Sequence, residues 1–187
     1  MPVIVVDRKI ASETYTAYLG ADNYVVGQIA GEYAANLLKK QGTVSEILGL
    51  AGSSPAIERH KGFLDTLKAY PNIRVVNQIP GNWLQTKAFT EVAKAASSIV
   101  KTDLVFAHND MMALGTKEAL QKYDPANRVK IIGIDALPGK DAGIEFVAEK
   151  KITASILYPT GGEEAIRLAL KISVTPFSNC QPRLPIF

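Results

Sequence analysis

Short β-branched runs alternate with amphipathic stretches along almost the whole chain, and this alternation constrains the fold more than any other feature. Each run is bounded by turn or charged residues, which is typical of strands buried on both faces of a sheet. We expect the strands at residues 3–6, 44–49, 73–78, 104–107, 129–134 and 154–157. Strand, helix and strand at roughly 30 residues per unit predict βαβ crossovers, and hence an α/β fold with parallel sheets flanked by helices.

The stretches between the strands carry apolar residues at helical spacing. Helices are expected over residues 24–40, 84–100 and 110–122. The residues that share one face of each helix are Val25, Ile29, Tyr33 and Leu37; Leu84, Ala88, Val92, Ala95 and Ile99; and Met111, Leu114 and Glu118, with Ala119 and Leu120 beside them. From Ser173 on the pattern breaks, because Pro176, Pro182 and Pro185 follow closely, so we expect a loop or an irregular end there.

Composition excludes several classes of protein. The 187 residues are 47% hydrophobic and 21% charged, with a formal net charge of only +3, which is the balance of an ordinary globular protein. The basic residues are scattered, so no nucleic-acid or membrane footprint is visible. No apolar run reaches the roughly 18 residues that a membrane helix needs. Cys180 is the one cysteine, which excludes an internal disulfide and a cysteine-based zinc site.

The common catalytic motifs are absent from the sequence. It contains no phosphate-binding G-x-x-x-x-G-K-S/T, no strand followed by G-x-G-x-x-G, no G-x-S-x-G elbow and no H-E-x-x-H. Asp7 and Asp135 could be imagined as the acid–base pair of a glycoside hydrolase. The flanking Arg8 and Arg59 would hold both carboxylates ionised, whereas a general acid needs a raised pKa. We therefore expect no enzyme in this region, no cofactor and no metal.

Polar and aromatic residues follow the expected strands at the point where each strand ends. In an open parallel sheet, ligands bind in the crevice beyond the carboxyl ends of the strands. The residues found there, directly after a strand or early in the next helix, are Asp7, Arg8, Arg59, Trp83, Asn109, Asp135 and Tyr158. Carboxylates, guanidinium forks and amides match the paired hydroxyls of a sugar, and an aromatic face can lie against its ring.

Each of these residues also has a purely structural interpretation. Asp110 is expected as a helix N-cap, and Ser53 or Ser54 before Pro55 suits the same role. Asp7 and Arg8 could form a local ion pair, Trp83 could belong to the core, and Asn109 could cap a turn. His60 and His108 lack a third partner in the sequence and favour surface or structural roles. The argument for a site therefore rests on the shared position of the seven residues at strand ends.

Four stretches of the chain resemble type I periplasmic sugar-binding proteins of the ribose-binding kind, and the related effector domains of the lactose-repressor family. These stretches are Pro2–Arg8, Ala51–Phe63, Phe106–Gly115 and Ile132–Asp135, and the similarity extends over residues 1–172. Three further stretches are similar to the periplasmic sensor domains of hybrid two-component sensor kinases. They are Leu104–Asp110, Gly133–Gly139 and Tyr158–Gly162.

The resemblance implies a role for each candidate residue. Asp7 and Arg8 would bind sugar hydroxyls from one lobe, and Arg59, Asn109 and Asp135 from the other. Trp83 stands where the family places an aromatic residue that stacks on the sugar. Tyr158 stands where the ribose binder has a glutamine, so the role of this residue and the exact sugar stay open. Ribose, fructose or a similar small monosaccharide fits the set.

The resemblance also implies how the domains are arranged. Residues 1–22 would be part of a first lobe, residues 23–154 a complete second lobe, and residues 155–187 a return into the first lobe with an irregular tail. The chain begins directly with an apolar strand instead of a signal peptide, which indicates a fragment. Such a fragment should bind sugars weakly and associate, for example as a homodimer, because part of an apolar face is uncovered.

Three functions remain open at this point, and the first is preferred. The chain would be the sugar-sensing periplasmic domain of a hybrid two-component kinase that signals by lobe closure. It could instead be the effector domain of a cytoplasmic lactose-repressor-type regulator, or the substrate-binding protein of a sugar ABC transporter. A downstream membrane helix, an upstream helix-turn-helix or a stop after the binding domain would distinguish them. This region itself would contact neither nucleic acid nor, except through flanking segments, a membrane.

Overall fold

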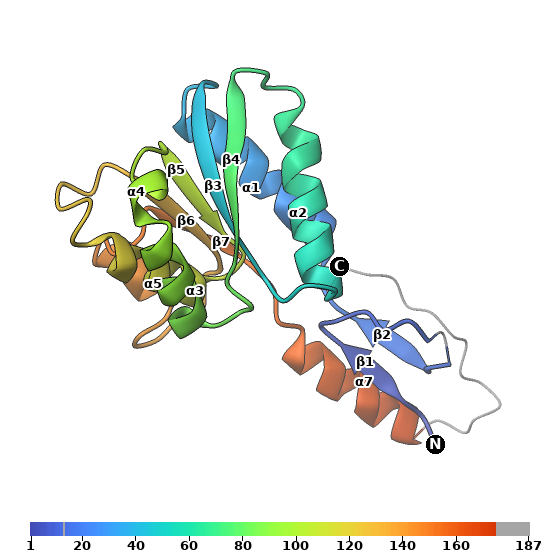
Figure 1. Ribbon diagram of the computed structural model, residues 1–187. Coiled ribbons are helices and arrows are strands. Elements are labelled where there is room, and N and C mark those ends of the chain that lie inside the picture. Colours follow the sequence, from blue (N-terminus) through green and yellow to red (C-terminus); the bar gives the residue numbers. More distant parts are fainter. Residues whose placement is uncertain (13, 175–187) are drawn as a thin grey trace. The chain divides into compact units, whose positions relative to one another are not determined.

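The computed structural model describes residues 1–12 and 14–174, which fall into two compact units (Figure 1). Unit 1 comprises Met1–Asp22 and the chain from Pro159 on, and unit 2 comprises Asn23–Tyr158. The sequence analysis placed the end of the second lobe at residue 154, which would detach the last strand of the sheet; in the structure this strand belongs to unit 2. The three prolines of the expected tail lie outside the described residues.

Unit 2 is built on a five-stranded parallel sheet in the order β4-β3-β5-β6-β7. The strands are β3 (Gly42–Leu48), β4 (Ile73–Pro80), β5 (Leu104–Ala107), β6 (Lys130–Asp135) and β7 (Ala154–Leu157). All four residues of β5 are buried, as expected for a central strand covered on both faces. The α/β class with a parallel sheet flanked by helices is confirmed, and β5 and β7 have the predicted bounds.

Helices cover both faces of this sheet. They are α1 (Asn23–Leu37) and α2 (Ser54–Leu67) on one face, and α3 (Gln85–Lys94), α4 (Ala96–Ile99), α5 (Asp110–Leu120) and α6 (Gly143–Ala148) on the other (Figure 1). Side chains alternate along β5: Val105 and Ala107 join the core under α3 to α6, while Phe106 stacks on Phe63 of α2 with the ring centroids 4.4 Å apart. No described helix is long and apolar enough to cross a membrane.

The chain changes face between β3 and β5. The helix after β3, α2, lies on one face, and the helix after β5, α5, lies on the other. The loops that follow these neighbouring strands therefore diverge, which in open α/β sheets creates the ligand-binding crevice.

Helix α1 packs with a face that the sequence analysis did not predict. The expected stripe is largely exposed: Val25, Ile29 and Tyr33 are 43%, 49% and 40% exposed. The buried face consists instead of small residues, namely Val26, Gly27, Ala30, Gly31, Ala34 and Ala35, with Asn23 at its start. A Cβ on Gly27 would lie 2.2 Å from the carbonyl oxygen of Arg59 on α2. The two helices thus approach backbone to backbone, where large side chains would not fit.

Other elements differ from the prediction in smaller ways. The helix expected over 84–100 is interrupted at Ala95, where φ is −103° and ψ is 9°, so it forms α3 and α4. The sequence analysis did not place β2 (Ala17–Leu19), α6 or α7 (Gly162–Val174). Each of the first two is short and carries little periodicity of its own, so packing decides its structure.

Unit 1 contains a two-stranded parallel sheet and a helix. Strand β1 (Ile4–Val6) pairs with β2 (Ala17–Leu19), with Val5 opposite Tyr18. Asp7 follows β1 in a left-handed backbone conformation with φ of 71°, and its N–H donates to the Leu19 carbonyl at 2.9 Å. The Tyr18 hydroxyl donates to the Asp7 carbonyl at 3.0 Å. These bonds fix the turn that carries Asp7 and Arg8.

Candidate functional site

Five of the seven predicted site residues gather at one edge of unit 2. All five strands are parallel, so their carboxyl ends meet at this edge. Trp83 follows β4, Asn109 follows β5, Asp135 ends β6 and Tyr158 follows β7, while Arg59 reaches the edge from α2. We expected this common location from the order of strands and loops, because the carboxyl ends of parallel strands meet at one edge of a sheet.

Arg59 has a buried and well-bonded side chain. The residue is 4% exposed, its Nε donates to Asn23 Oδ1 at 2.9 Å, and its Nη1 donates to the His108 carbonyl oxygen. The guanidinium carbon lies 4.7 Å from the ring centroid of Tyr158 and 5.6 Å from that of Trp83. Cation–π attraction to both rings adds to these hydrogen bonds and restricts the guanidinium to one orientation.

Trp83 lies in a strained loop after β4. Asn82 and Trp83 have φ of 52° and 70°, values that non-glycine residues adopt only where the surroundings enforce them. The indole covers Gly49, where a Cβ would lie 2.1 Å from the ring atom Cη2. Trp83 also packs against the apolar core under α3 to α6. One face of this side chain is thus structural, in line with the core role considered from the sequence.

Asn109 caps helix α5, a role that the sequence analysis assigned to Asp110. Its Oδ1 accepts from the Met112 N–H at 2.8 Å, and its Nδ2 donates to the Trp83 carbonyl at 3.3 Å. The amide therefore ties the β4–α3 loop to the start of α5. Asp110 is displaced into the first turn, because the asparagine before it has the extended backbone of an N-cap.

Asp135 stands at a sharp turn at the end of β6. It has φ of 125°, and Ala136 after it has φ of 47°. The Ala136 N–H donates to Asp110 Oδ2 at 2.8 Å and to Ser155 Oγ at 2.9 Å. Asp110 is 3% exposed, and burial raises the pKa of its carboxyl. The turn that carries Asp135 thus rests on a buried side chain that reaches it from α5.

Tyr158 is buried, with 6% exposure, directly after β7. Its hydroxyl oxygen accepts from Asn23 Nδ2 at 3.5 Å, and its ring lies under the guanidinium of Arg59. Asn23, which the sequence analysis did not single out, therefore connects Tyr158 and Arg59. These contacts give Tyr158 a part in holding Arg59.

Asp7 and Arg8, the two remaining candidates, belong to unit 1. The Arg8 Nε lies 3.7 Å from Asp7 Oδ2, and the two side chains are 50% and 47% exposed. This is the local ion pair considered from the sequence, and at this exposure it contributes little to stability.

Behind the strand ends of unit 2, the sequence analysis missed a buried cluster of Glu46, His60 and His108. Glu46 and His108 are both fully buried, and Glu46 Oε1 accepts from His108 Nε2 at 2.9 Å. His60 Nδ1 lies 2.9 Å from Glu46 Oε2. The sequence feature that could have revealed this cluster is a glutamate inside the apolar strand β3, because a buried carboxylate requires hydrogen-bond partners.

The three groups of this cluster shift one another's pKa values. Burial alone would raise the pKa of the Glu46 carboxyl, but hydrogen bonds from His108 and His60 outweigh it and hold the pKa below its usual value. The bond to Glu46 raises the pKa of His60. Burial lowers the pKa of His108. Among the described residues no group of histidine, cysteine, aspartate and glutamate could hold a metal ion.

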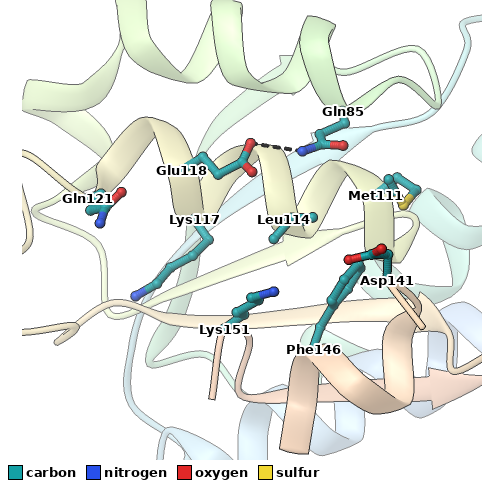
Figure 2. A pocket seen from close by; sticks show the side chains of 9 residues that line it. All are labelled: Gln85, Met111, Leu114, Lys117, Glu118, Gln121, Asp141, Phe146 and Lys151. Carbon is teal, nitrogen blue, oxygen red and sulfur yellow. Dashed lines mark hydrogen bonds between the residues drawn. The ribbon is translucent and has the colours of Figure 1, made fainter. Parts of the chain in front are cut away.

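A hollow of about 450 Å³ lies elsewhere in unit 2, between α3, α5 and α6 (Figure 2). Its walls include Lys117, Lys151, Glu118 and Asp141, so cations and carboxylates balance. Glu118 accepts from Gln85 at 2.9 Å, as Figure 2 shows, and Lys151 pairs with Glu149 at 2.7 Å. The hollow contains none of the predicted site residues.

Comparison with known proteins identifies the family of this chain. Residues 1–174 match the periplasmic binding protein domain. The ribose import binding protein RbsB of Salmonella typhimurium is 33% identical over 174 residues, which cover 92% of this chain and 57% of that protein. The galactofuranose-binding protein YtfQ of Escherichia coli is 29% identical over 74% of this chain and 46% of its own length. The chain thus spans about half the length of these relatives.

Solved structures show the same fold. The fructose-binding periplasmic domain of the hybrid two-component system BT1754 superposes with a TM-score of 0.90 and 39% identity, over 100% of this chain and 60% of that one. A periplasmic solute-binding protein of an ABC transporter from Actinobacillus succinogenes, with bound D-allose, gives 0.84 and 25%, over 100% and 65%. Unit 2 is one complete lobe and unit 1 part of the other, as expected. The chain belongs to the periplasmic binding protein domain family.

Proposed function

We propose that the strand-end residues of unit 2 bind a small sugar. The observation that carries this proposal is the combination of Arg59, Asn109, Asp135 and Trp83 at one edge of a parallel sheet. A guanidinium fork donates two hydrogen bonds, a carboxylate accepts from neighbouring hydroxyls and an amide offers one of each. The indole supplies a flat apolar surface for the C–H face of the sugar ring.

Asp7 and Arg8 are proposed as further sugar ligands. Both are polar, half-exposed and held on a turn fixed by backbone hydrogen bonds at the end of β1. The resemblance to sugar-binding proteins supports this role for the pair.

The sugar itself is proposed from the relatives. The sensor domain that is 39% identical is named as fructose-binding, and the 33% identical import protein is named as ribose-binding. Titration calorimetry with D-fructose, D-ribose and D-allose tests the proposal. Binding of one of them, abolished by Asp135→Ala with the far-ultraviolet circular dichroism unchanged, is the expected result. Unaltered affinity in Asp135→Ala would refute the site.

We further propose that the sugar site serves a periplasmic sensor of the hybrid two-component kind. The likeness to the sensor domain, with a TM-score of 0.90, supports this role. Sugar would then draw the two lobes together and pass this change to a kinase across the membrane. A second candidate is the binding protein of a sugar importer, which the names of the 33% identical relatives favour.

The DNA on both sides of this reading frame separates the two candidates. A membrane helix and a kinase region downstream would establish the sensor. A stop soon after the binding domain, beside genes for a sugar permease, would establish the importer. A helix-turn-helix upstream would contradict both and indicate a cytoplasmic regulator.

Weak binding and self-association of the 187-residue chain also remain predictions. They follow from an incomplete first lobe, whose apolar surface a second copy could cover. Sedimentation velocity and calorimetry on the same sample test them. A monomer with micromolar affinity for the sugar would contradict both.

A further inference from the structure

The cluster of Glu46, His60 and His108 has a defined hydrogen-bond direction. The Gly49 N–H donates to His108 Nδ1 at 3.3 Å, so this nitrogen carries no proton. His108 is therefore protonated on Nε2, from which it donates to Glu46 Oε1. His60 donates from Nδ1 to the same carboxylate. The Glu46 carboxylate thus accepts from both rings.

Each histidine links the Glu46 carboxylate to Arg59, His60 as the neighbouring residue on α2 and His108 through its backbone carbonyl. His60 is the next residue along α2, so its bond to Glu46 fixes α2 against β3 one residue from Arg59. The His108 carbonyl accepts from Arg59 Nη1. The His108 ring also lies near that of Trp83, with centroids 6.3 Å apart. One buried carboxylate therefore holds the two segments between which the guanidinium is placed.

Stability alone does not account for a carboxylate at this position. Glu46 lies in a strand between Val44 and Ile47, both fully buried, where an apolar side chain would avoid the cost of removing a charge from water. Replacing buried ion pairs by apolar groups is often neutral or stabilising, whereas a buried charged group with directed bonds can specify one geometry. The geometry specified here is that of Arg59.

We propose that Glu46, through His108 and His60, is a positioning residue that sets the orientation of the Arg59 guanidinium and thereby the affinity for sugar. The inference rests on the proposed function as far as the sugar is concerned. The orientation of Arg59 can be measured without any sugar, so the two proposals can fail separately.

The variant that tests this is Glu46→Gln. The amide oxygen can still accept from His108, and the amide nitrogen can donate to His60 Nδ1 if that ring carries its proton on Nε2. Shape and packing are retained while the charge is lost. The matched control is Asp124→Asn, which neutralises another buried carboxylate, one that accepts from the Val129 N–H at 2.8 Å before β6.

The first readout is the side-chain Nε–H signal of Arg59 in ¹⁵N–¹H spectra of the full chain without sugar. This signal is identified by its loss in Arg59→Lys. Because Arg59 Nε donates to Asn23, a change in its orientation shifts or broadens the signal. We expect such a change in Glu46→Gln and none in Asp124→Asn. An unmoved signal in folded Glu46→Gln would overturn the proposal.

The second readout is the dissociation constant for the sugar that the unaltered chain binds. Glu46→Gln should raise this dissociation constant about tenfold, because the charge-assisted hydrogen bonds that hold Arg59 in place are lost. In the Arg59→Lys background the same change should have an effect of less than about twofold, since residues that act through one another are not additive. If Glu46→Gln raises the dissociation constant by the same factor with Arg59 and with Lys at that position, Glu46 has a general structural role and the proposal that it positions Arg59 is refuted.

Two further outcomes are also decisive. If Glu46→Gln does not fold, His60→Gln replaces it, because the His60 side chain is 33% exposed and its loss leaves the core intact. A smaller shift of the Arg59 signal is then expected, and its absence counts against the proposal. If no sugar binds the unaltered chain, the proposed function fails, and the Arg59 signal alone decides whether Glu46 positions it.

Discussion

The Asp110 carboxylate accepts a hydrogen bond from the backbone N–H of Ala136 at 2.8 Å, and this bond supports the turn on which Asp135 is displayed. Asp135 and Ala136 have φ of 125° and 47°, so the turn is strained and needs support from outside it. Asp110 Oδ2 also accepts from Ser155 Oγ at 2.8 Å. A side chain that the sequence analysis assigned to helix capping thus positions a proposed sugar ligand.

Removing this support should cost both stability and binding. In Asp110→Ala, the Ala136 N–H loses one acceptor in a partly buried site, and we expect a loss of about 1–3 kcal/mol in the free energy of unfolding. Sugar affinity should fall as well, because Asp135 is no longer fixed. Urea unfolding and calorimetry measure the two effects. The comparison variant is Asp110→Asn, which keeps an acceptor for Ala136 and should lose less; equal losses would show that the bond is unimportant.

The pKa of Asp110 gives the same pair of variants a pH signature. Burial raises this pKa in the folded state, so between the unfolded and folded pKa values the native protein binds more protons. The contribution of Asp110 to stability therefore falls as pH rises through the folded pKa. Relative to Asp110→Asn, the unaltered chain should lose stability as pH rises above the ordinary aspartate pKa of about 4. Parallel curves for the two proteins would contradict the assignment.

Much of unit 2 could be predicted from the sequence because its strands are short apolar runs bounded by turn or charged residues. Such runs located β5, a central strand whose four residues are all buried, and the edge strand β7, whose residues are partly buried or exposed, with the bounds that the structure has. Parallel topology then determined that residues after the strands lie at one edge. This is why five residues chosen only by their place after strands belong to the same edge.

The sequence analysis failed where packing, and not periodicity, decides. The stripe of Val25, Ile29 and Tyr33 has helical spacing, but the small residues Gly27 and Gly31 allow a closer contact, so the opposite face of α1 is buried. Single-sequence patterns reveal which residues are apolar, not which face a neighbouring helix can approach. The same limit hid the partners of Glu46, because His60 and His108 meet it only in the folded chain.

Gly49→Ala should displace the indole of Trp83. An added Cβ would lie 2.1 Å from the ring, which cannot be accommodated without movement of the side chain. Trp83 is the single tryptophan, so its fluorescence reports this movement without interference. We expect a red-shifted emission, stronger quenching by acrylamide and a sugar affinity weaker by about tenfold, the value of lost ring stacking.

Gly162→Ala is the matched control for this change. Gly162 begins α7, and nothing lies within 4 Å of the position where its Cβ would be. Emission, quenching and affinity should stay as in the unaltered chain. If Gly49→Ala also leaves all three unchanged, Trp83 does not cover Gly49 in solution, and the proposed stacking surface is refuted.

The contribution of His60 to the stability of the chain should fall as pH rises. Its hydrogen bond to Glu46 raises its pKa in the folded state, so its contribution is fully present below the unfolded pKa and is lost as pH rises through the folded value. The difference in unfolding free energy between the unaltered chain and His60→Gln should therefore shrink from pH 5.5 to pH 8.5, a range that brackets the ordinary histidine pKa of about 6.5. The effect is modest because the side chain is 33% exposed.

His108 acts in the opposite direction and must be separated from His60. Burial lowers its pKa, so below the unfolded value the unfolded chain binds a proton that the native protein does not, and stability falls as pH falls. The difference between the unfolding free energies of the unaltered chain and His60→Gln removes most of this contribution, since His108 is present in both proteins and His60 is only a minor cause of its lowered pKa. A difference that is constant across the pH range would contradict the Glu46–His60 bond.

The close packing of α1 on α2 predicts that Gly27→Ala will disturb Arg59. The new methyl group would lie 2.2 Å from the Arg59 carbonyl oxygen, and backbone atoms cannot move aside as a flexible side chain can. We expect a loss of about 1–3 kcal/mol in the free energy of unfolding, the usual cost of overpacking. Because the displaced segment carries the guanidinium, the affinity for sugar should fall in the same variant.

Gly162→Ala again serves as the control: it should leave the affinity unchanged and alter stability by less than about 1 kcal/mol. Urea unfolding and calorimetry on the two variants test the packing. An unaltered unfolding midpoint in Gly27→Ala would show that the helices do not meet backbone to backbone, and the position assigned to Arg59 would then be wrong.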